Sequence, residues 1–129
     1  MSAVLSAYRI SRPDLASASL TELIGQATDV GQDYPYSGYV MFNLLNAAEE
    51  IGIHLGHDPD ADDETFFTFG QSDLSAIERL NLDKLLDTAL CDIDLDGEQL
   101  RAAAVDSFSW LSGLVRDTPP EEILVLDID

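Results

Sequence analysis

The chain has 129 residues, a length typical of one domain, and 46% of them are apolar, which excludes an intrinsically disordered protein. It carries 25 acidic and 6 basic residues, so its net charge is −19. Such a charge repels phosphates, which argues against nucleic acids and anionic membranes as partners and favours a basic protein surface or cations. An acidic surface that serves only solvation, as in a salt-adapted organism, explains the charge equally well.

The N-terminal segment predicts a strand followed by weak helices. Residues 3–10 are apolar and partly alternating, as in a strand. Ser11 is a potential cap for the helix that follows, with Pro13 in its first turn. Ser19 and Glu22 form a second potential cap, so two short helices explain the pattern as well as one long helix does.

A loop and the clearest helix follow. Residues 29–38 combine glycine, proline and polar acceptors and predict a loop. Residues 39–52 predict a helix, because apolar side chains recur on one face and Gly52 provides a stop. The apolar stripe consists of Val40, Leu44, Ala47, Ala48 and Ile51, and the opposite face carries Asn43, Asn46 and Glu50.

The middle of the chain predicts an acidic loop, a short strand and two helices. The loop covers residues 54–65, and the strand lies within residues 66–70. A helix follows with Ser72 as its cap, but its apolar face shifts before the helix would end. A break near Asn81 explains this shift better than one continuous helix.

The C-terminal segment predicts a long helix and a final strand. Residues 97–116 keep one apolar face, and Pro119 and Pro120 end the helix because proline cannot continue it. Residues 122–129 have the composition of a strand. The sequence therefore predicts a single α+β domain over residues 1–129, mainly helical, with a small sheet that includes the N- and C-terminal strands.

The stretch DIDLDG resembles the first half of a calcium-binding EF-hand loop. Asp92, Asp94 and Asp96 alternate and are followed by Gly97. An EF-hand loop also needs a bidentate glutamate as its twelfth residue, and here that position is Ala103. Asp96 is better explained as the N-cap of the next helix, where its carboxylate accepts free backbone N–H groups.

A second acidic cluster, HDPDADDE, lies in the loop over residues 54–65. His54 and His57 have a spacing that metal sites use, but no third ligand has a fixed position, so an exposed solvated loop is favoured over a metal site. For protein docking this loop is the first candidate, because long irregular loops protrude and carry function. The predicted partner-binding acids are Asp58, Asp60, Asp62, Asp63 and Glu64, with Asp92, Asp94 and Asp96 second. The predicted aromatic anchors are Tyr34, Tyr36 and Tyr39; these tyrosines could also cover the core, and covering is favoured.

The sequence lacks the motifs of common catalytic sites. Both histidines lie in the acidic loop, Cys91 has no positioned base, and neither a GxSxG elbow nor a glycine-rich phosphate loop occurs. We therefore expect a non-enzymatic protein without a metal or cofactor. A lone cysteine indicates a reducing compartment, and with no signal-peptide pattern or membrane-length apolar run, the expected location is the cytoplasm.

Two resemblances add to these patterns. The opening SAYRISRPDL and the closing helix with EILVLDID resemble the YfbM-like family of small bacterial domains, which has no settled activity, so this likeness implies a layout only. As a small, strongly acidic chain without catalytic motifs, the protein is also similar in class to immunity proteins. That similarity implies an inhibitor that covers the active site of a basic toxin or nuclease. The alternatives are a DNA mimic that inhibits a DNA-binding defence enzyme, a housekeeping domain of a salt-adapted proteome, and a metal-binding regulator.

Overall fold

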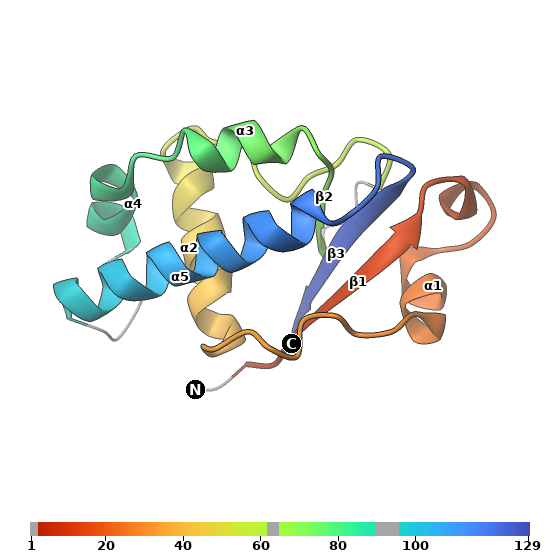
Figure 1. Ribbon diagram of the computed structural model, residues 1–129, viewed down its shortest axis with the longest axis horizontal. Helices are drawn as coiled ribbons and strands as arrows, with labels where there is room; N and C mark the ends of the chain where they lie inside the picture. The colour runs from red at the N-terminus through yellow and green to blue at the C-terminus, as the bar shows by residue number, and fades with distance from the viewer. Residues whose placement is uncertain (1–2, 62–64, 90–95) are drawn as a thin grey trace.

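The computed structural model describes residues 3–61, 65–89 and 96–129 (Figure 1). Its elements in chain order are β1 (Leu5–Ser11), the 3-10 helix η1 (Pro13–Ala16), α1 (Leu20–Gln26), α2 (Gly38–Glu50), β2 (Phe67–Phe69), α3 (Asp73–Glu78), α4 (Leu82–Ala89), α5 (Gly97–Arg116) and β3 (Glu122–Ile128). The three strands form an antiparallel sheet in the order β1-β3-β2. The predicted α+β class and the presence of both terminal strands in one sheet are confirmed.

β3 is the central strand, and it is buried on both faces. It pairs with β1 from Leu5 opposite Ile128 to Ser11 opposite Glu122, and with β2 along its other edge. The four residues 123–126 have an exposed fraction of 0%. Because alternate residues of a strand face opposite sides, this burial requires cover on both faces of the sheet. It also explains why the last strand alternates so weakly in sequence.

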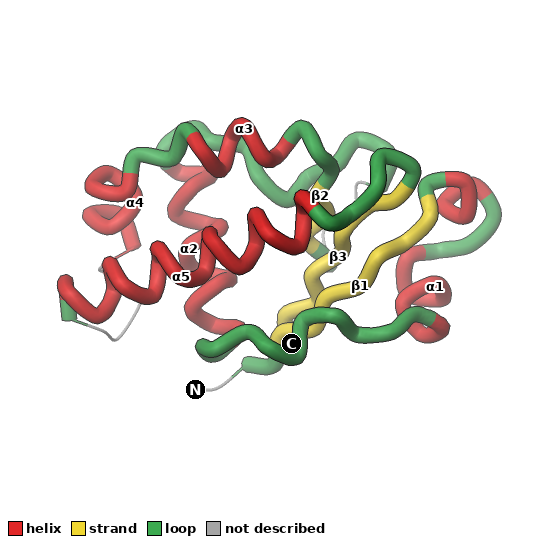
Figure 2. Tube along the Cα trace, in the orientation of Figure 1, coloured by secondary structure: helices red, strands yellow, loops and turns green. Residues whose placement is uncertain are grey.

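Two groups of helices supply this cover. Leu124 and Leu126 pack on the larger core, together with apolar residues of α2, α4 and α5. Ile123 and Val125 pack on a smaller core with Ile10 and with residues from η1 and α1. Figure 2 shows α1 on the other side of the sheet from α2 and α5. In the described part of the chain, no helix combines the length and the apolarity needed to cross a membrane.

Local signals set most helix boundaries as predicted. Gly52 follows α2 with φ of 87°, a left-handed conformation that glycine adopts without strain. Asn81 separates α3 from α4, and its side-chain oxygen accepts a hydrogen bond from the Lys84 N–H at 3.2 Å. Asp96 caps α5 in a complete capping box with Gln99. The predicted break near Asn81 and the capping role of Asp96 are therefore confirmed.

Two other predicted caps are wrong, and one is confirmed. Ser11 is the last residue of β1, and no side chain caps η1. Ser72 has a helical backbone and caps nothing; the Asp73 carboxylate instead accepts the N–H of Gly70 at 2.8 Å. The hydroxyl of Ser19 does accept the Glu22 N–H, at 3.3 Å, so two short helices replace one long helix here.

The acidic loop is more ordered than predicted. The Thr68 N–H donates to the Gly56 carbonyl at 2.8 Å, and the Asp58 N–H donates to the Thr68 carbonyl at 3.1 Å. These bonds cover the outer edge of β2, which would otherwise present unpaired backbone groups. Leu55 and Ala61 are both buried beside this segment. The prediction of an exposed, solvated loop over HDPDADDE is therefore wrong at Asp58 and Ala61, which are buried.

We expect Leu124→Ala to lower the free energy of unfolding by about 2–5 kcal/mol, because it leaves a cavity in the larger core, which the central strand shares with α2, α4 and α5. Urea unfolding monitored by circular dichroism measures this loss. Val105→Ala is the control, since Val105 is 47% exposed on α5 and its truncation should change the stability by less than about 0.5 kcal/mol. Equal effects of the two substitutions would contradict the position assigned to β3.

Candidate functional site

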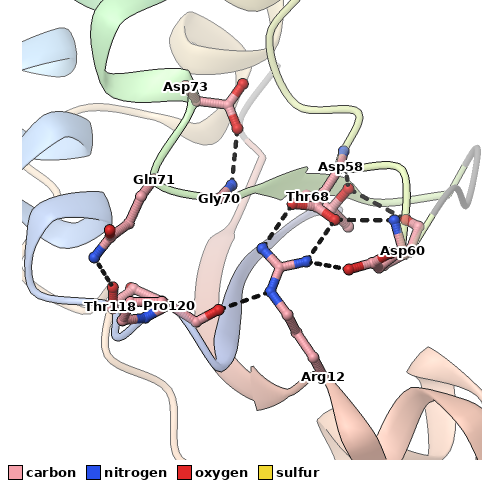
Figure 3. A network of polar contacts seen from close by, with 10 residues as sticks. Arg12, Asp58, Asp60, Thr68, Gly70, Gln71, Asp73, Thr118 and Pro120 are labelled. Carbon is pink, nitrogen blue, oxygen red and sulfur yellow. Dashed lines mark hydrogen bonds and ion pairs between the residues drawn. The ribbon is translucent and has the colours of Figure 1, made fainter.

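The first polar cluster, the Arg12 network, joins three distant segments (Figure 3). Arg12 follows β1 and donates from both terminal nitrogens to the two carboxylate oxygens of Asp58, each at 2.9 Å. It also donates to Asp60 at 2.6 Å and, through Nε, to the Pro120 carbonyl at 3.0 Å. One guanidinium thereby ties the end of β1 to the acidic loop and to the turn before β3.

Asp58 is the buried member of this network. Its side chain is 5% exposed, and its Oδ1 also accepts the Asp60 N–H at 3.0 Å. Burial raises the pKa of Asp58, but the hydrogen bonds from Arg12 and Asp60 and the charge of Arg12 outweigh it, so the net pKa is lowered. The carboxylate therefore stays ionised inside the fold.

Gly70 allows the ion pair to form. A Cβ at this position would lie 2.6 Å from Asp58 Oδ2 and 2.7 Å from a terminal nitrogen of Arg12. Any side chain there would have to displace one of the two charged groups. In the described residues, no buried side-chain nitrogen or oxygen lacks a hydrogen-bond partner. The Arg12 network therefore holds segments of the fold together and leaves no buried polar side chain among these described residues without a partner. Asp58 is its buried member, and Asp60 lies at its exposed edge.

We expect Asp58→Asn to lower the free energy of unfolding at pH 7 by about 3 kcal/mol, because it leaves Arg12 without its buried partner. Asp60→Asn makes the same change in net charge but acts on a carboxylate that is 60% exposed, so its cost should stay below about 1 kcal/mol. Urea unfolding of both variants measures the difference.

The cost of Asp58→Asn should also depend on pH. The pKa of Asp58 is lower in the folded protein than its ordinary 3.8, so its stabilisation is complete above that value. It is lost as the pH falls through the lower, folded-state pKa. If the cost were the same at pH 7 and in strong acid, the ion pair would not be its cause.

The second cluster is aromatic and joins the loop over residues 29–37 to α5. The Tyr34 hydroxyl lies 2.8 Å from the Ser107 hydroxyl, and the Tyr34 ring lies 4.8 Å from the Trp110 ring. The Trp110 indole N–H donates to Asp33 at 3.0 Å, and the Tyr36 hydroxyl donates to Asp106 at 2.6 Å. Both tyrosines are partly buried against the larger core. They cover the core, which is the option the sequence favoured.

Tyr34 should make the stability sensitive to alkaline pH. Burial raises its pKa from 10.0 to about 12, so the folded protein holds a proton that the unfolded chain releases. Its contribution is complete below pH 10 and falls, by up to about 1.4 kcal/mol per pH unit, as the pH rises towards the folded-state pKa. Urea unfolding between pH 9 and 11.5 should show a shallower decline for Tyr34→Phe. Identical slopes would contradict the burial of this phenol.

The third cluster, which we call the α2 outer face, consists of Tyr39, Phe42, Asn43, Asn46, Glu49 and Glu50. It lies opposite the buried stripe of α2. Four of its residues line a shallow hollow of about 410 Å³: Asn43, Asn46, Glu49 and Glu50. At its margin, Phe67 makes an edge contact with Phe42, with 6.1 Å between the ring centroids. Of the predicted aromatic anchors, only Tyr39 lies here.

The other predicted site residues fall into two groups. Asp96 is engaged as the cap of α5. Asp62, Asp63, Glu64, Asp92 and Asp94, together with Cys91, lie outside the described residues. Within the described ranges, His, Cys, Asp and Glu side chains form no group of three or more that could hold a metal ion. His57 Nε2 lies 3.9 Å from a Glu49 oxygen.

The remaining surface has few cations to balance its acids. Arg101 contacts Asp83 between α5 and α4, and Arg12 holds Asp58 and Asp60. Among the described residues, these three carboxylates are the ones that contact an arginine or lysine side chain. Arg9 and Arg79 instead donate to neutral oxygens of Thr118 and Ser75. The negative charge is therefore mostly uncompensated at the surface.

No protein-family model matches the sequence, and neither the curated proteins nor the solved structures include one with significant similarity to it. The resemblances to YfbM-like domains and to immunity proteins therefore stay predictions.

Proposed function

We propose that this protein is a non-enzymatic, acidic binding protein of the immunity type, which covers the active site of a basic toxin or nuclease. The observation that carries the proposal is the uncompensated charge: the net charge is −19, and few described carboxylates contact a basic side chain. Such a surface attracts Lys- and Arg-rich proteins over long distances.

In this mechanism, charge controls the association rate and apolar contact controls the lifetime of the complex. Unpaired carboxylates steer a basic partner during diffusion and raise the association rate, most strongly at low salt. Desolvated aromatic contacts then set the lifetime of the complex. Inhibition needs no chemistry from this chain, because a protein seated over an active site excludes the substrate.

The proposal is tested by capturing the partner at low salt and measuring its association rate. We expect one basic partner in a stoichiometric complex, and an association rate that falls at least about tenfold between 0.05 and 0.5 M NaCl. Expression of that partner alone should be toxic to cells, and co-expression of this protein should abolish the toxicity.

Two results would overturn this proposal. One is an association rate insensitive to salt. The other is the absence of a specific partner combined with a melting temperature that rises steeply with salt. The second result would support the alternative in which the acidic surface serves solvation in a salt-adapted proteome.

A further inference from the structure

We infer that the α2 outer face is the docking surface, and that it takes a basic segment of a partner protein that carries a large apolar side chain. This inference rests on the proposed function and gives it a location. It depends on three observations at the same face: exposed aromatic rings, a fixed geometry and acids at the C-terminal end of the helix.

The exposed aromatic rings are the first observation. Tyr39 is 38% exposed and Phe42 is 41% exposed. They are three residues apart on one helix, a spacing that places their side chains side by side. The partly buried Tyr34 and Tyr36 differ from this pair, because each already has a hydrogen-bond partner on α5. Exposed aromatic side chains of this kind are enriched in the hot spots of protein interfaces.

The fixed geometry is the second observation. Phe42 packs against Phe67 of β2, and the Asn43 side chain donates to the Tyr39 carbonyl at 2.9 Å. On the other side of the helix, Met41, Leu44 and Leu45 are almost fully buried in the larger core. The face is therefore held by a rigid element, and little conformational freedom remains to be lost when a partner binds.

The placement of acids is the third observation. α1, α3, α4 and α5 each have an acidic residue in the first turn, where the helix dipole favours negative charge. α2 has none there and instead carries Glu49 and Glu50 in its last turn, with no basic residue. Carboxylates at this end oppose the helix dipole, and a cation from a partner would relieve the conflict.

These observations define the chemistry of the partner segment. α2 itself contains no lysine or arginine, and the acids lie about two to three turns beyond the exposed rings. A matching segment has lysine or arginine over Glu49 and Glu50 and an apolar side chain against Phe42. Asn43 and Asn46, which line the hollow together with the two glutamates, offer amide groups to the backbone of this segment.

The experiment uses two synthetic peptides of equal charge as probes, one with alternating lysine and leucine and one with serine in place of leucine. Binding to the ¹⁵N-labelled protein is followed by NMR titration at low salt. We expect the leucine peptide to bind about tenfold more tightly and to shift resonances of the α2 outer face. The serine peptide should show weaker contact spread over the acidic surface.

Two pairs of variants locate the effect. Phe42→Ser should remove the tenfold advantage of the leucine peptide, and Val105→Ser, at another exposed apolar position, should keep it. The double substitution Glu49→Gln with Glu50→Gln should weaken the binding of both peptides. The control, Glu22→Gln with Glu98→Gln, makes the same charge change at exposed sites on α1 and α5 and should weaken binding less. The ¹⁵N spectrum of each variant establishes that it is folded, and Tyr39→Ser replaces Phe42→Ser if the latter is not.

The outcomes separate this inference from the proposed function. The α2 outer face is not the docking surface if both peptides bind equally, or if Val105→Ser reduces the affinity for the leucine peptide as much as Phe42→Ser does. Salt-dependent capture of a basic toxin could still succeed in that case. If the peptides select this face but the captured partner is neither basic nor toxic, the immunity function fails and the basic-segment site stands.

Discussion

β1 and β2 do not pair with each other; each pairs with β3, the last strand of the chain. The sheet therefore cannot assemble until the C-terminal segment has been added, and the two strands that flank β3 come from positions more than 50 residues apart. The same strand divides the apolar residues into two cores, since Leu124 and Leu126 face the larger core and Ile123 and Val125 the smaller one. Placing every helix against one of these cores depends on β3 and on its burial on both faces. The cost is a set of long-range pairings, which slows folding.

The Arg12 network stabilises the sheet beside β2, its shortest strand. β2 has only three residues, and its outer edge is covered by the backbone around Gly56 and Asp58. Arg12 holds that segment through Asp58 and also holds the Pro120 carbonyl just before β3. The chain has only six basic residues, and one of them, Arg12, pairs with carboxylates that stabilise the fold. Gly70 is the complementary requirement, because its missing side chain leaves room for the two charged groups.

Features encoded by neighbouring residues could be predicted from the sequence, and features that need distant partners could not. The helix stripe of α2, the break at Asn81 and the cap at Asp96 each depend on residues a few positions apart. The burial of Asp58 depends on Arg12, 46 residues away, and a run of similar acids gives no sign of which one is internal. The failure of Ser72 as a cap is local instead: its backbone is already helical, and the neighbouring Asp73 carboxylate accepts the Gly70 N–H. The α2 outer face does have a local signal, since Phe42 is a large apolar residue that lies opposite the apolar stripe among polar residues.

The acids of this protein are therefore not equivalent. Some serve the fold, as Asp58 does in its ion pair and Asp96 does as a cap. α3 and α4 have an acid near each end, so the favourable first-turn carboxylate offsets the unfavourable one. In α2 nothing in the first turn offsets Glu49 and Glu50. Solvation alone does not require carboxylates at the unfavourable end of a helix, because the same charge at its beginning would hydrate equally well and stabilise the helix. Glu49 and Glu50 lie on the same face as the exposed rings of Tyr39 and Phe42, about two to three turns further along the helix, and the proposed docking of a basic segment would account for this placement.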